Sequence, residues 1–284
     1  MAQLEFTKMH GLGNDFVVVD LVTQRARLEP ERIRALADRH RGIGFDQLLV
    51  AEPPTTPDAD FRYRIYNTDG SEAEQCGNGA RCLVRFLRER RLTRKRRIVL
   101  EVPKGHIVAR ALDDGQVEVD LGEPDFDPRA LPFAPGPHAE LVEGGARVSF
   151  PGGDPAPVEL ALVSLGNPHA VCFVADVAAA PVADLGAALQ GHAAFPESVN
   201  AGFCEVVDRG FLRLRVFERG VGETQACGSG ACAAVSAAIR AGHCEARVKV
   251  SLPGGKLRLA WQGPGHAIKM TGETAVVFEG RIEP

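Results

Sequence analysis

The pattern of apolar and polar positions predicts a chain built mostly of short β-strands. In residues 61–66 (Phe-Arg-Tyr-Arg-Ile-Tyr), apolar and aromatic side chains alternate with arginine, as on a strand with one buried face. Residues 212–217 alternate in the same way, and shorter apolar runs bounded by turn residues are typical of strands. These runs are 16–20, 98–102, 117–121, 159–163, 170–174, 248–252 and 257–261. Strands are therefore expected to outnumber helices.

Four stretches show helical rather than strand-like patterns. In 80–87, apolar residues recur at intervals of three and four. Small apolar residues fill 231–239, and Gly242 follows, which is typical of a buried helix and its end. Two further helices are expected near 30–40 and 182–190.

The chain also repeats itself. Leu12-Gly13-Asn14 recurs 153 residues later as Leu165-Gly166-Asn167, and Cys76-Gly77-Asn78-Gly79-Ala80 recurs 151 residues later as Cys227-Gly228-Ser229-Gly230-Ala231. Glu72 and Glu223 each lie four residues before their cysteine, and Gln47 corresponds to Asn200. Several matches in one order predict two similarly folded halves, each with one Leu-Gly-Asn turn and one Cys-Gly-x-Gly-Ala segment.

The boundary between the halves is expected near Gly122. The Pro- and Gly-rich stretch 135–157 is expected to be a loop with one strand within it. A chain of 284 residues with 45% apolar and 25% charged residues is long enough for two domains, each with a core.

Composition narrows the function classes. No apolar stretch approaches the roughly 20 residues that a membrane-spanning helix needs, so no membrane partner is expected. A net charge of −4 argues against a nucleic-acid partner, and the basic run 88–97 is interpreted as a solvated helix end. Because the first residues lack the pattern of a secretory signal, we expect a cytoplasmic protein. Its seven cysteines then favour structural or catalytic thiols over disulfides.

Two of these cysteines occupy a place suited to proton transfer. Cys76 and Cys227 each precede Gly-x-Gly-Ala at the expected start of a helix, where unpaired N–H groups and the helix dipole favour an anion. The pKa of each thiol is therefore expected to fall towards the working range. The N–H groups of the following residues are expected to bind a carboxylate. These residues are Gly77, Asn78, Gly228 and Ser229.

If the halves face each other, a substrate carbon between them has one thiol on each side. One thiolate would remove the α-proton from one face while the opposite thiol donates to the other, which inverts the centre. The carboxylate held by the helix starts would be stabilised as carbanion charge develops. This chemistry requires no electron-sink cofactor, and Lys104 lies in no context that suggests a Schiff base.

Other interpretations of the cysteines remain. Free cysteine is among the most buried residue types, so all seven could be packing residues. We prefer that interpretation for Cys82, Cys172, Cys204, Cys232 and Cys244. The spacing of neighbouring cysteines does not fit a zinc site, so no metal is expected. A non-enzymatic thiol protein in redox or metal buffering is the alternative from a different class.

Six motifs together resemble diaminopimelate epimerase. They are Met9-His10-Gly11-Leu12-Gly13-Asn14-Asp15-Phe16, Gly42-Ile43-Gly44-Phe45-Asp46-Gln47, Tyr66-Asn67-Thr68-Asp69-Gly70-Ser71-Glu72, the first cysteine segment through Arg81-Cys82, Gly166-Asn167-Pro168-His169, and Glu218-Arg219-Gly220 with the second cysteine segment. They follow the family's order and cover nearly the whole chain.

The resemblance implies an α+β fold of two pseudo-symmetric domains, each a barrel-like mixed or antiparallel sheet around a central helix, with the active site in the cleft between them. The domains are expected at 1–121 with 273–284, and at 122–272. The resemblance also implies interconversion of LL- and meso-diaminopimelate in lysine biosynthesis, without pyridoxal phosphate or metal, by a homodimer.

The resemblance further assigns roles to individual residues. Cys76 and Cys227 match the acid/base thiols, and His169 and Glu218 match groups that assist proton transfer. The polar wall that recognises the substrate corresponds to Asn14, Gln47, Asn67, Asn167, Asn200, Glu218 and Arg219. The wall fits the second amino-acid group of diaminopimelate, because Arg219 suits its carboxylate and amide or acidic oxygens suit its ammonium.

Two relatives of the same fold are the nearest alternatives. Proline or hydroxyproline racemases are not expected to have this Glu-Arg pair and asparagine-rich wall. Phenazine-biosynthesis-type isomerases lack the paired thiols. The sequence therefore favours a diaminopimelate epimerase over both.

Overall fold

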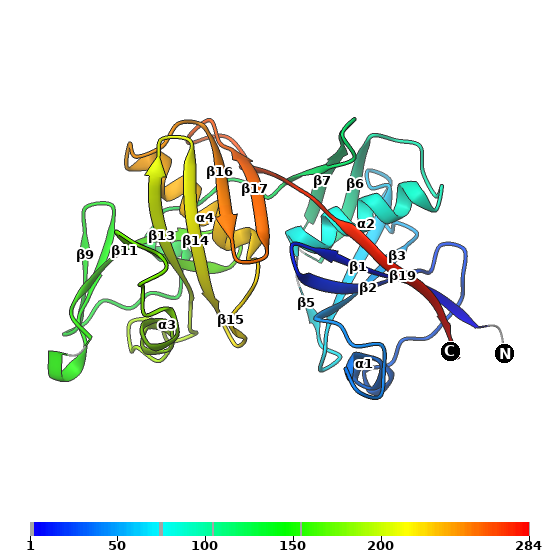
Figure 1. Ribbon diagram of the computed structural model, residues 1–284, viewed down its shortest axis with the longest axis horizontal. Coiled ribbons are helices and arrows are strands. Elements are labelled where there is room, and N and C mark those ends of the chain that lie inside the picture. Colours follow the sequence, from blue (N-terminus) through cyan, green and yellow to red (C-terminus); the bar gives the residue numbers. More distant parts are fainter. Residues whose placement is uncertain (1–2, 74–75, 104, 154, 284) are drawn as a thin grey trace. The chain divides into compact units, whose positions relative to one another are not determined.

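The computed structural model describes residues 3–73, 76–103, 105–153 and 155–283. The chain forms two compact units, Met1–Asp120 with Thr271–Pro284, and Leu121–Met270. Figure 1 shows that each unit is a β-rich body with one helix enclosed by its strands and a second helix at its side. Within the described residues, no helix is long and apolar enough to cross a bilayer.

The first unit is one curved mixed sheet around a helix. Its elements are β1 (Leu4–Gly11), β2 (Asn14–Asp20), α1 (Pro30–Ala37), β3 (Gln47–Glu52), β4 (Phe61–Asn67), β5 (Glu72–Ala73), α2 (Gly77–Glu89), β6 (Arg97–Val102), β7 (Gly105–Ala111), β8 (Val117–Asp120) and β19 (Ala275–Ile282). The strands are ordered β19, β1, β2, β3, β4, β6, β7 and β8, and β5 forms a short hairpin with β4. β2 pairs with β3, and β4 with β6, in parallel; the other pairs are antiparallel.

Both faces of the sheet are apolar: α1 packs on one of them, and α2 packs on the other, at the centre of the unit. Val17 and Val19 pack in the cluster that contains Ile33 of α1. Strand side chains alternate in direction, so Phe16 and Val18, which are fully buried, face the other side, towards α2. Helix α2 contacts β1, β2, β3, β7 and β8. The apolar spacing in 80–87 thus predicted this helix correctly, and its central position is the one that the resemblance implied.

The second unit repeats this arrangement. Its elements are η1 (Pro128–Ala130), β9 (Ala139–Val142), β10 (Gly145–Val148), η2 (Pro151–Gly153), β11 (Val158–Ser164), β12 (Pro168–Phe173), α3 (Val182–Gln190), β13 (Asn200–Asp208), β14 (Phe211–Glu218), β15 (Gly222–Glu223), α4 (Gly228–Arg240), β16 (Arg247–Leu252) and β17 (Gly255–Ala260). Strand β18 (Lys269–Gly272) lies where the chain returns to the first unit.

The pairing of the strands shows the repeat directly. From β1 to β7, successive pairs in the sheet are antiparallel, parallel, antiparallel, parallel and antiparallel. From β11 to β17 the same five relations occur in the same order. Helix α4 contacts β11, β12, β13, β14, β16 and β17, as α2 contacts its own sheet. The α+β fold of two pseudo-symmetric halves is therefore confirmed.

Two local expectations were wrong. The stretch 135–157 contains two strands rather than one, because β9 and β10 form a hairpin. Gly144 has φ 83°, a backbone conformation that residues with a side chain rarely adopt. The hairpin buries Ala146 and Val148 in the core. The helix expected near 30–40 ends at Ala37, because Asp38 accepts hydrogen bonds from the N–H groups of the next turn and stops it.

Candidate active site

The first candidate half-site is built around Cys76, which is the N-cap of α2. Its Sγ accepts a hydrogen bond from the N–H of Gly79 at 3.3 Å. The backbone of Cys76 is extended, with φ −147° and ψ 110°, as a helix N-cap requires. Gly77 and Asn78 form the first turn, so their N–H groups lie at the helix start, where an anion is favoured.

Asn14 and Asn78 lie beside this thiol. The Oδ1 atom of Asn14 accepts from Nδ2 of Asn78 at 3.3 Å and faces Sγ of Cys76 at 4.0 Å. The amide of Asn14 is held from behind, because its Nδ2 donates to Oδ2 of Asp46 at 2.9 Å. Asp46 in turn accepts from Arg39 at 2.8 Å. The orientation of Asn14 is therefore fixed, with its carbonyl oxygen towards the thiol.

Gln47 and Asn67 form a second group in this unit. They are opposite each other on β3 and β4, and Nε2 of Gln47 donates to Oδ1 of Asn67 at 3.1 Å. The structure thus joins five of the six predicted residues of this half into two hydrogen-bonded groups, one at the helix start and one at the strand ends, and the sixth, Gly77, is the first residue of α2.

The second candidate half-site has Cys227 in the same place. Cys227 is the N-cap of α4, and its Sγ accepts from the N–H of Gly230 at 3.4 Å. The hydroxyl of Ser229 lies 3.7 Å from the thiol and accepts from Nδ2 of Asn167 at 3.3 Å. The Glu218 side chain also contacts this thiol and accepts from Thr224. A carboxylate beside the thiol distinguishes this half, because Asn67 occupies the matching position in the first.

The pKa of Cys227 runs against the expectation drawn from its helix start. Burial raises the pKa of this thiol well above its usual value, and the charge and hydrogen bond of Glu218 raise it further. The Gly230 N–H and the Ser229 hydroxyl lower it, as expected of a helix N-terminus, but desolvation of a thiol that is only 4% exposed is the larger effect. The expectation of a lowered pKa was therefore wrong for Cys227, which is a neutral thiol in this structure.

His169 lies next to Asn167 in the same half-site. It is 1% exposed, and burial, with the charge of Arg219, lowers the pKa of its imidazole to about 3. The ring is therefore neutral near pH 7. Its Nε2 lies 3.0 Å from Oδ1 of Asn167, an atom that can only accept, so Nε2 carries the proton and Nδ1 is the acceptor nitrogen.

Asn200 connects the remaining wall residues. It lies opposite His169 on β13, its Nδ2 donates to the carbonyl of Pro168 at 3.0 Å, and its Oδ1 accepts from the N–H of Arg219 at 2.9 Å. The Arg219 side chain donates to the carbonyl of Glu197 at 3.3 Å. All eight predicted residues of the second unit thus lie at one end of α4 or in the strand ends and turns that lead to it.

Sequence reasoning did not select some residues that hold these groups. Asp46 lies within a quoted motif, but nothing in the motif indicates that it orients Asn14. Arg81 is fully buried and donates to Oδ1 of Asn78 at 2.8 Å, and Thr224 holds Glu218. The available signal for Arg81 was an arginine between apolar residues in the first turns of the expected helix. Lys104 lies outside the described residues.

The other five cysteines are buried. Burial raises the pKa of Cys82 to about 12, and it also raises the pKa values of Cys172, Cys204 and Cys244. These three and Cys82 are therefore inert thiols, as preferred from the sequence. Over the ranges that the structure describes, no group of three or more His, Cys, Asp and Glu residues could hold a metal ion.

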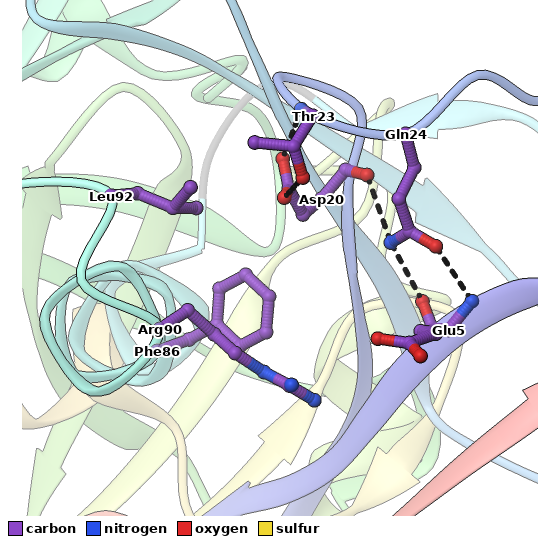
Figure 2. A pocket seen from close by; sticks show the side chains of 7 residues that line it. All are labelled: Glu5, Asp20, Thr23, Gln24, Phe86, Arg90 and Leu92. Carbon is purple, nitrogen blue, oxygen red and sulfur yellow. Dashed lines mark hydrogen bonds between the residues drawn. The ribbon is translucent and has the colours of Figure 1, made fainter.

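A cavity of about 240 Å³ in the first unit contains none of the predicted site residues. Figure 2 shows its lining, which is Glu5, Asp20, Thr23, Gln24, Phe86, Arg90 and Leu92. Its polar groups already bond to one another: Gln24 donates to the carbonyls of Glu5 and Asp20 at 3.1 Å each. Arg90 pairs with Glu279 at 3.2 Å. These polar groups of the cavity already have hydrogen-bond or ion-pair partners, so we do not regard the cavity as a second candidate site.

Comparison with known proteins identifies the family. Residues 6–126 and 161–277 match the family described as Diaminopimelate epimerase. The chain belongs to the diaminopimelate epimerase family. It is 55% identical over 279 residues to the diaminopimelate epimerase of Azotobacter vinelandii, covering 98% of this chain and 99% of that one. It is 53% identical over 283 residues to the diaminopimelate epimerase of a Psychrobacter species, covering 99% and 95%.

Solved structures resemble the fold at low sequence identity. A phenazine biosynthesis protein of the PhzF family from Bacillus anthracis is similar with a TM-score of 0.69 and 17% identity, over 99% of each chain. A hydroxyproline epimerase from Agrobacterium vitis is similar with a TM-score of 0.67 and 15% identity, over 99% of this chain and 92% of that one. These structures share the fold, whereas the sequence places this chain among the diaminopimelate epimerases, which are isomerases.

Proposed function

We propose that the protein interconverts LL-diaminopimelate and meso-diaminopimelate without a cofactor or metal: one thiolate removes the α-proton, and the other thiol delivers its own proton to the opposite face of the carbon. The observation that carries the proposal is the repeated half-site, in which each unit places one cysteine at the N-cap of its central helix. Family membership supplies the substrate and a place in lysine biosynthesis. The catalytic centre would combine both half-sites, from domains at 1–121 with 273–284 and at 122–272.

In this mechanism the two thiols start in opposite protonation states. Cys227 starts as the thiol, because burial and Glu218 raise its pKa, so in one direction of the reaction it donates the proton and Cys76 removes it. The reverse direction exchanges these roles. Glu218 and neutral His169 would assist by forming hydrogen bonds within the half-site while Cys227 loses and regains its proton.

The helix starts would bind the reacting end of the substrate. The N–H groups of Gly77, Asn78, Gly228 and Ser229 would hold the α-carboxylate, and the dipoles of α2 and α4 would stabilise the negative charge that develops when the proton leaves. This electrostatic stabilisation takes the place of an electron sink.

The polar wall would bind the distal amino-acid group. Arg219 suits the distal carboxylate, and the amides of Asn14, Gln47, Asn67, Asn167 and Asn200, with Glu218, supply the oxygens that an ammonium needs. A substrate without the distal group would leave these polar atoms unpaired, so alanine is not expected to react.

We also propose a homodimer in the cytoplasm, with no nucleic-acid or membrane partner. Strand β19 supports a contact between subunits, because its Val277 and Phe278 are 55% and 45% exposed. The net charge of −4 disfavours a polyanion. Light scattering on the wild type and on Phe278→Asp tests the dimer, which should dissociate in the variant.

The activity test uses purified, reduced protein with LL-diaminopimelate and a chelator, without added cofactor. Formation of the meso isomer supports the proposal, and no reaction contradicts it. Cys76→Ala and Cys227→Ala should each abolish epimerisation, while Cys172→Ala, at a buried cysteine outside both half-sites, should retain it. Full activity in either of the first two variants would exclude the two-thiol mechanism.

A further inference from the structure

An arginine–glutamate pair occurs at the same place in both units. Arg64 and Glu72 in the first unit correspond to Arg215 and Glu223 in the second, each 151 residues later, which is the separation of the two N-cap cysteines. In the first pair, Nε and Nη2 of Arg64 donate to the two carboxylate oxygens at 2.9 Å each. In the second, the same atoms of Arg215 donate at 2.7 and 2.9 Å. Both pairs are bidentate.

The surroundings of the two pairs are equally alike. The side chains of Arg64 and Glu72 are 27% and 33% exposed, and those of Arg215 and Glu223 are 28% and 31% exposed. A bidentate, half-buried pair is better defined in geometry than a typical surface ion pair. Arg64 also lies over the ring of Tyr66 at 4.9 Å, and Arg215 donates to the carbonyl of Val177 at 3.1 Å. Each arginine is thus held by a second contact.

Each pair ties a two-residue strand to its neighbour. Strand β5 pairs with β4, and β15 pairs with β14, through two residues on each side. Such a short strand has little ladder of its own, and the arginine across the hairpin adds a bidentate contact to it. The turn of the first hairpin starts at Asn67, and the turn of the second starts at Glu218 and Arg219.

The hairpin end also leads to the thiol. Glu223 is followed by Thr224, which donates to Glu218, and Cys227 comes three residues later. The residues at the hairpin turn differ between the halves, with Asn67 in one and Glu218 in the other, but the ion pair is common to both. The pair therefore serves a task that both half-sites share, which is the placement of the hairpin ahead of the cysteine.

We propose that Arg64–Glu72 and Arg215–Glu223 are positioning pairs, each of which fixes the hairpin turn and the cysteine of its own half-site. The inference rests on the proposed function for its effect on catalysis. Neither pair takes part in the chemistry. Their contribution is to hold Asn67 in one half, and Glu218 with Arg219 in the other, within the small displacement that catalysis tolerates.

The test replaces one carboxylate at a time with the amide of the same size. In Glu223→Gln and in Glu72→Gln, kcat/KM for LL-diaminopimelate is expected to fall by about tenfold or more, since displacements near 1 Å can cost about a hundredfold. Arg215→Lys keeps the charge but loses the bidentate geometry, so it should behave like Glu223→Gln. The control is Glu159→Gln, which breaks the exposed Arg147–Glu159 pair of the same unit and should leave kcat/KM unchanged.

A second measurement needs no substrate. Alkylation of each cysteine is followed by mass spectrometry in the folded protein, with thermal unfolding as a check that each variant retains its fold. Glu223→Gln should speed the alkylation of Cys227 about threefold or more and leave Cys76 unchanged, because only its own hairpin is released. Glu72→Gln should change Cys76 and leave Cys227 unchanged.

The two measurements separate the possible failures. If both amide variants keep kcat/KM within about twofold of wild type and alkylation is unaltered, the positioning role is wrong. An equal effect on both cysteines from either variant also overturns it, because the role would then not be local to one half. If the wild type does not epimerise diaminopimelate, the proposed function fails, while the alkylation pattern still decides whether the pairs position the thiols.

Discussion

At the residue scale, the local environment decides the charge of each group in the second half-site. His169 and Cys227 both lie out of water, and burial favours the neutral form of each, although this lowers the pKa of the imidazole and raises that of the thiol. Glu218 is the ionisable partner of the thiol. A neutral thiol with a carboxylate beside it is suited to donate a proton and then to be reprotonated through its neighbours.

The burial of His169 predicts an acid-sensitive contribution to stability. Its folded pKa of about 3 lies below the ordinary value of 6.5, so the unfolded chain binds a proton that the folded chain does not. The contribution is complete above pH 6.5 and is lost as the pH falls towards 3, by up to about 1.4 kcal/mol per pH unit. Urea unfolding of the wild type and His169→Gln at several pH values measures it.

Carboxylates elsewhere affect the stability of the wild type and of His169→Gln equally. The difference between the two free energies of unfolding therefore isolates the effect of the histidine. The wild type should lose stability relative to His169→Gln as the pH falls from 6.5. Parallel stability curves over that range would show that the ring is accessible to protons in the folded state.

The sequence predicted which residues gather at each half-site but not how each is held. Cys76, Asn14 and Asn78 were selected from the repeat and the resemblance, and the structure joins these three by hydrogen bonds. The raised pKa of Cys227 was not predicted, because a motif shows the helix start but not how deeply the thiol is buried. Asp46 was missed for a related reason: its partner Asn14 is 32 residues away in the sequence, and only strand pairing brings them together.

At the element scale, each cysteine has a structural task besides its proposed chemistry. The Sγ atoms of Cys76 and Cys227 accept from the third residue of their helices, as serine or aspartate does at an N-cap. Serine at position 76 can keep this bond, whereas alanine cannot. Cys76→Ala is therefore expected to be less stable than Cys76→Ser by about 1 kcal/mol, with both inactive.

Urea denaturation of the two variants, together with the epimerase assay, measures this difference. Cys227→Ala and Cys227→Ser provide an independent second pair in the other unit. Equal stability of the serine and alanine variants in both units would show that the thiols do not cap their helices.

Helix α2 also depends on a glycine for its close approach to the sheet. A Cβ atom at Gly79 would lie 2.3 Å from Oη of Tyr63 and 3.0 Å from Leu49, both of which are buried. In an unobstructed helix, Gly→Ala stabilises by up to about 1 kcal/mol. Gly79→Ala should instead destabilise by about 1–3 kcal/mol, because the core is already full.

Thermal and urea unfolding measure the change, and Gly202→Ala is the control, since its Cβ would meet no atom closer than 3.7 Å. Epimerase activity should fall in Gly79→Ala, because the start of α2 must shift away from Tyr63. Unchanged stability in Gly79→Ala would mean that the helix does not pack this closely.

The apolar pattern predicted the four helices and about half of the strands, but no strand was predicted at β1, β3, β7, β13 or β19. Residues 16–19 in β2 show no alternation of apolar and polar side chains, because this strand is buried on both faces. The hairpin in 135–157 was underestimated, because one of its strands, β9, has exposed Glu140 and Leu141 and carries little apolar pattern. The end of α1 depended on a local turn at Asp38 that overrides the helical pattern beyond it.

At the scale of the whole molecule, the repeat explains why two of seven cysteines differ from the rest. The same five strand relations enclose α2 and α4, and each helix starts with a cysteine next to asparagine or serine groups. A single half-site carries one thiol and can act on one face of a carbon only. Inversion requires both, and this requirement is the central claim of the proposed mechanism.

The most direct test is a deuterium-labelling experiment with LL-diaminopimelate in D2O, analysed at low conversion. If one thiol removes the proton and the other, already exchanged with solvent, donates, then the meso product carries one deuterium at the inverted carbon. The recovered LL isomer then remains unlabelled. A meso product without deuterium, or equal labelling of product and recovered substrate from the start, would contradict a mechanism with one thiol on each face.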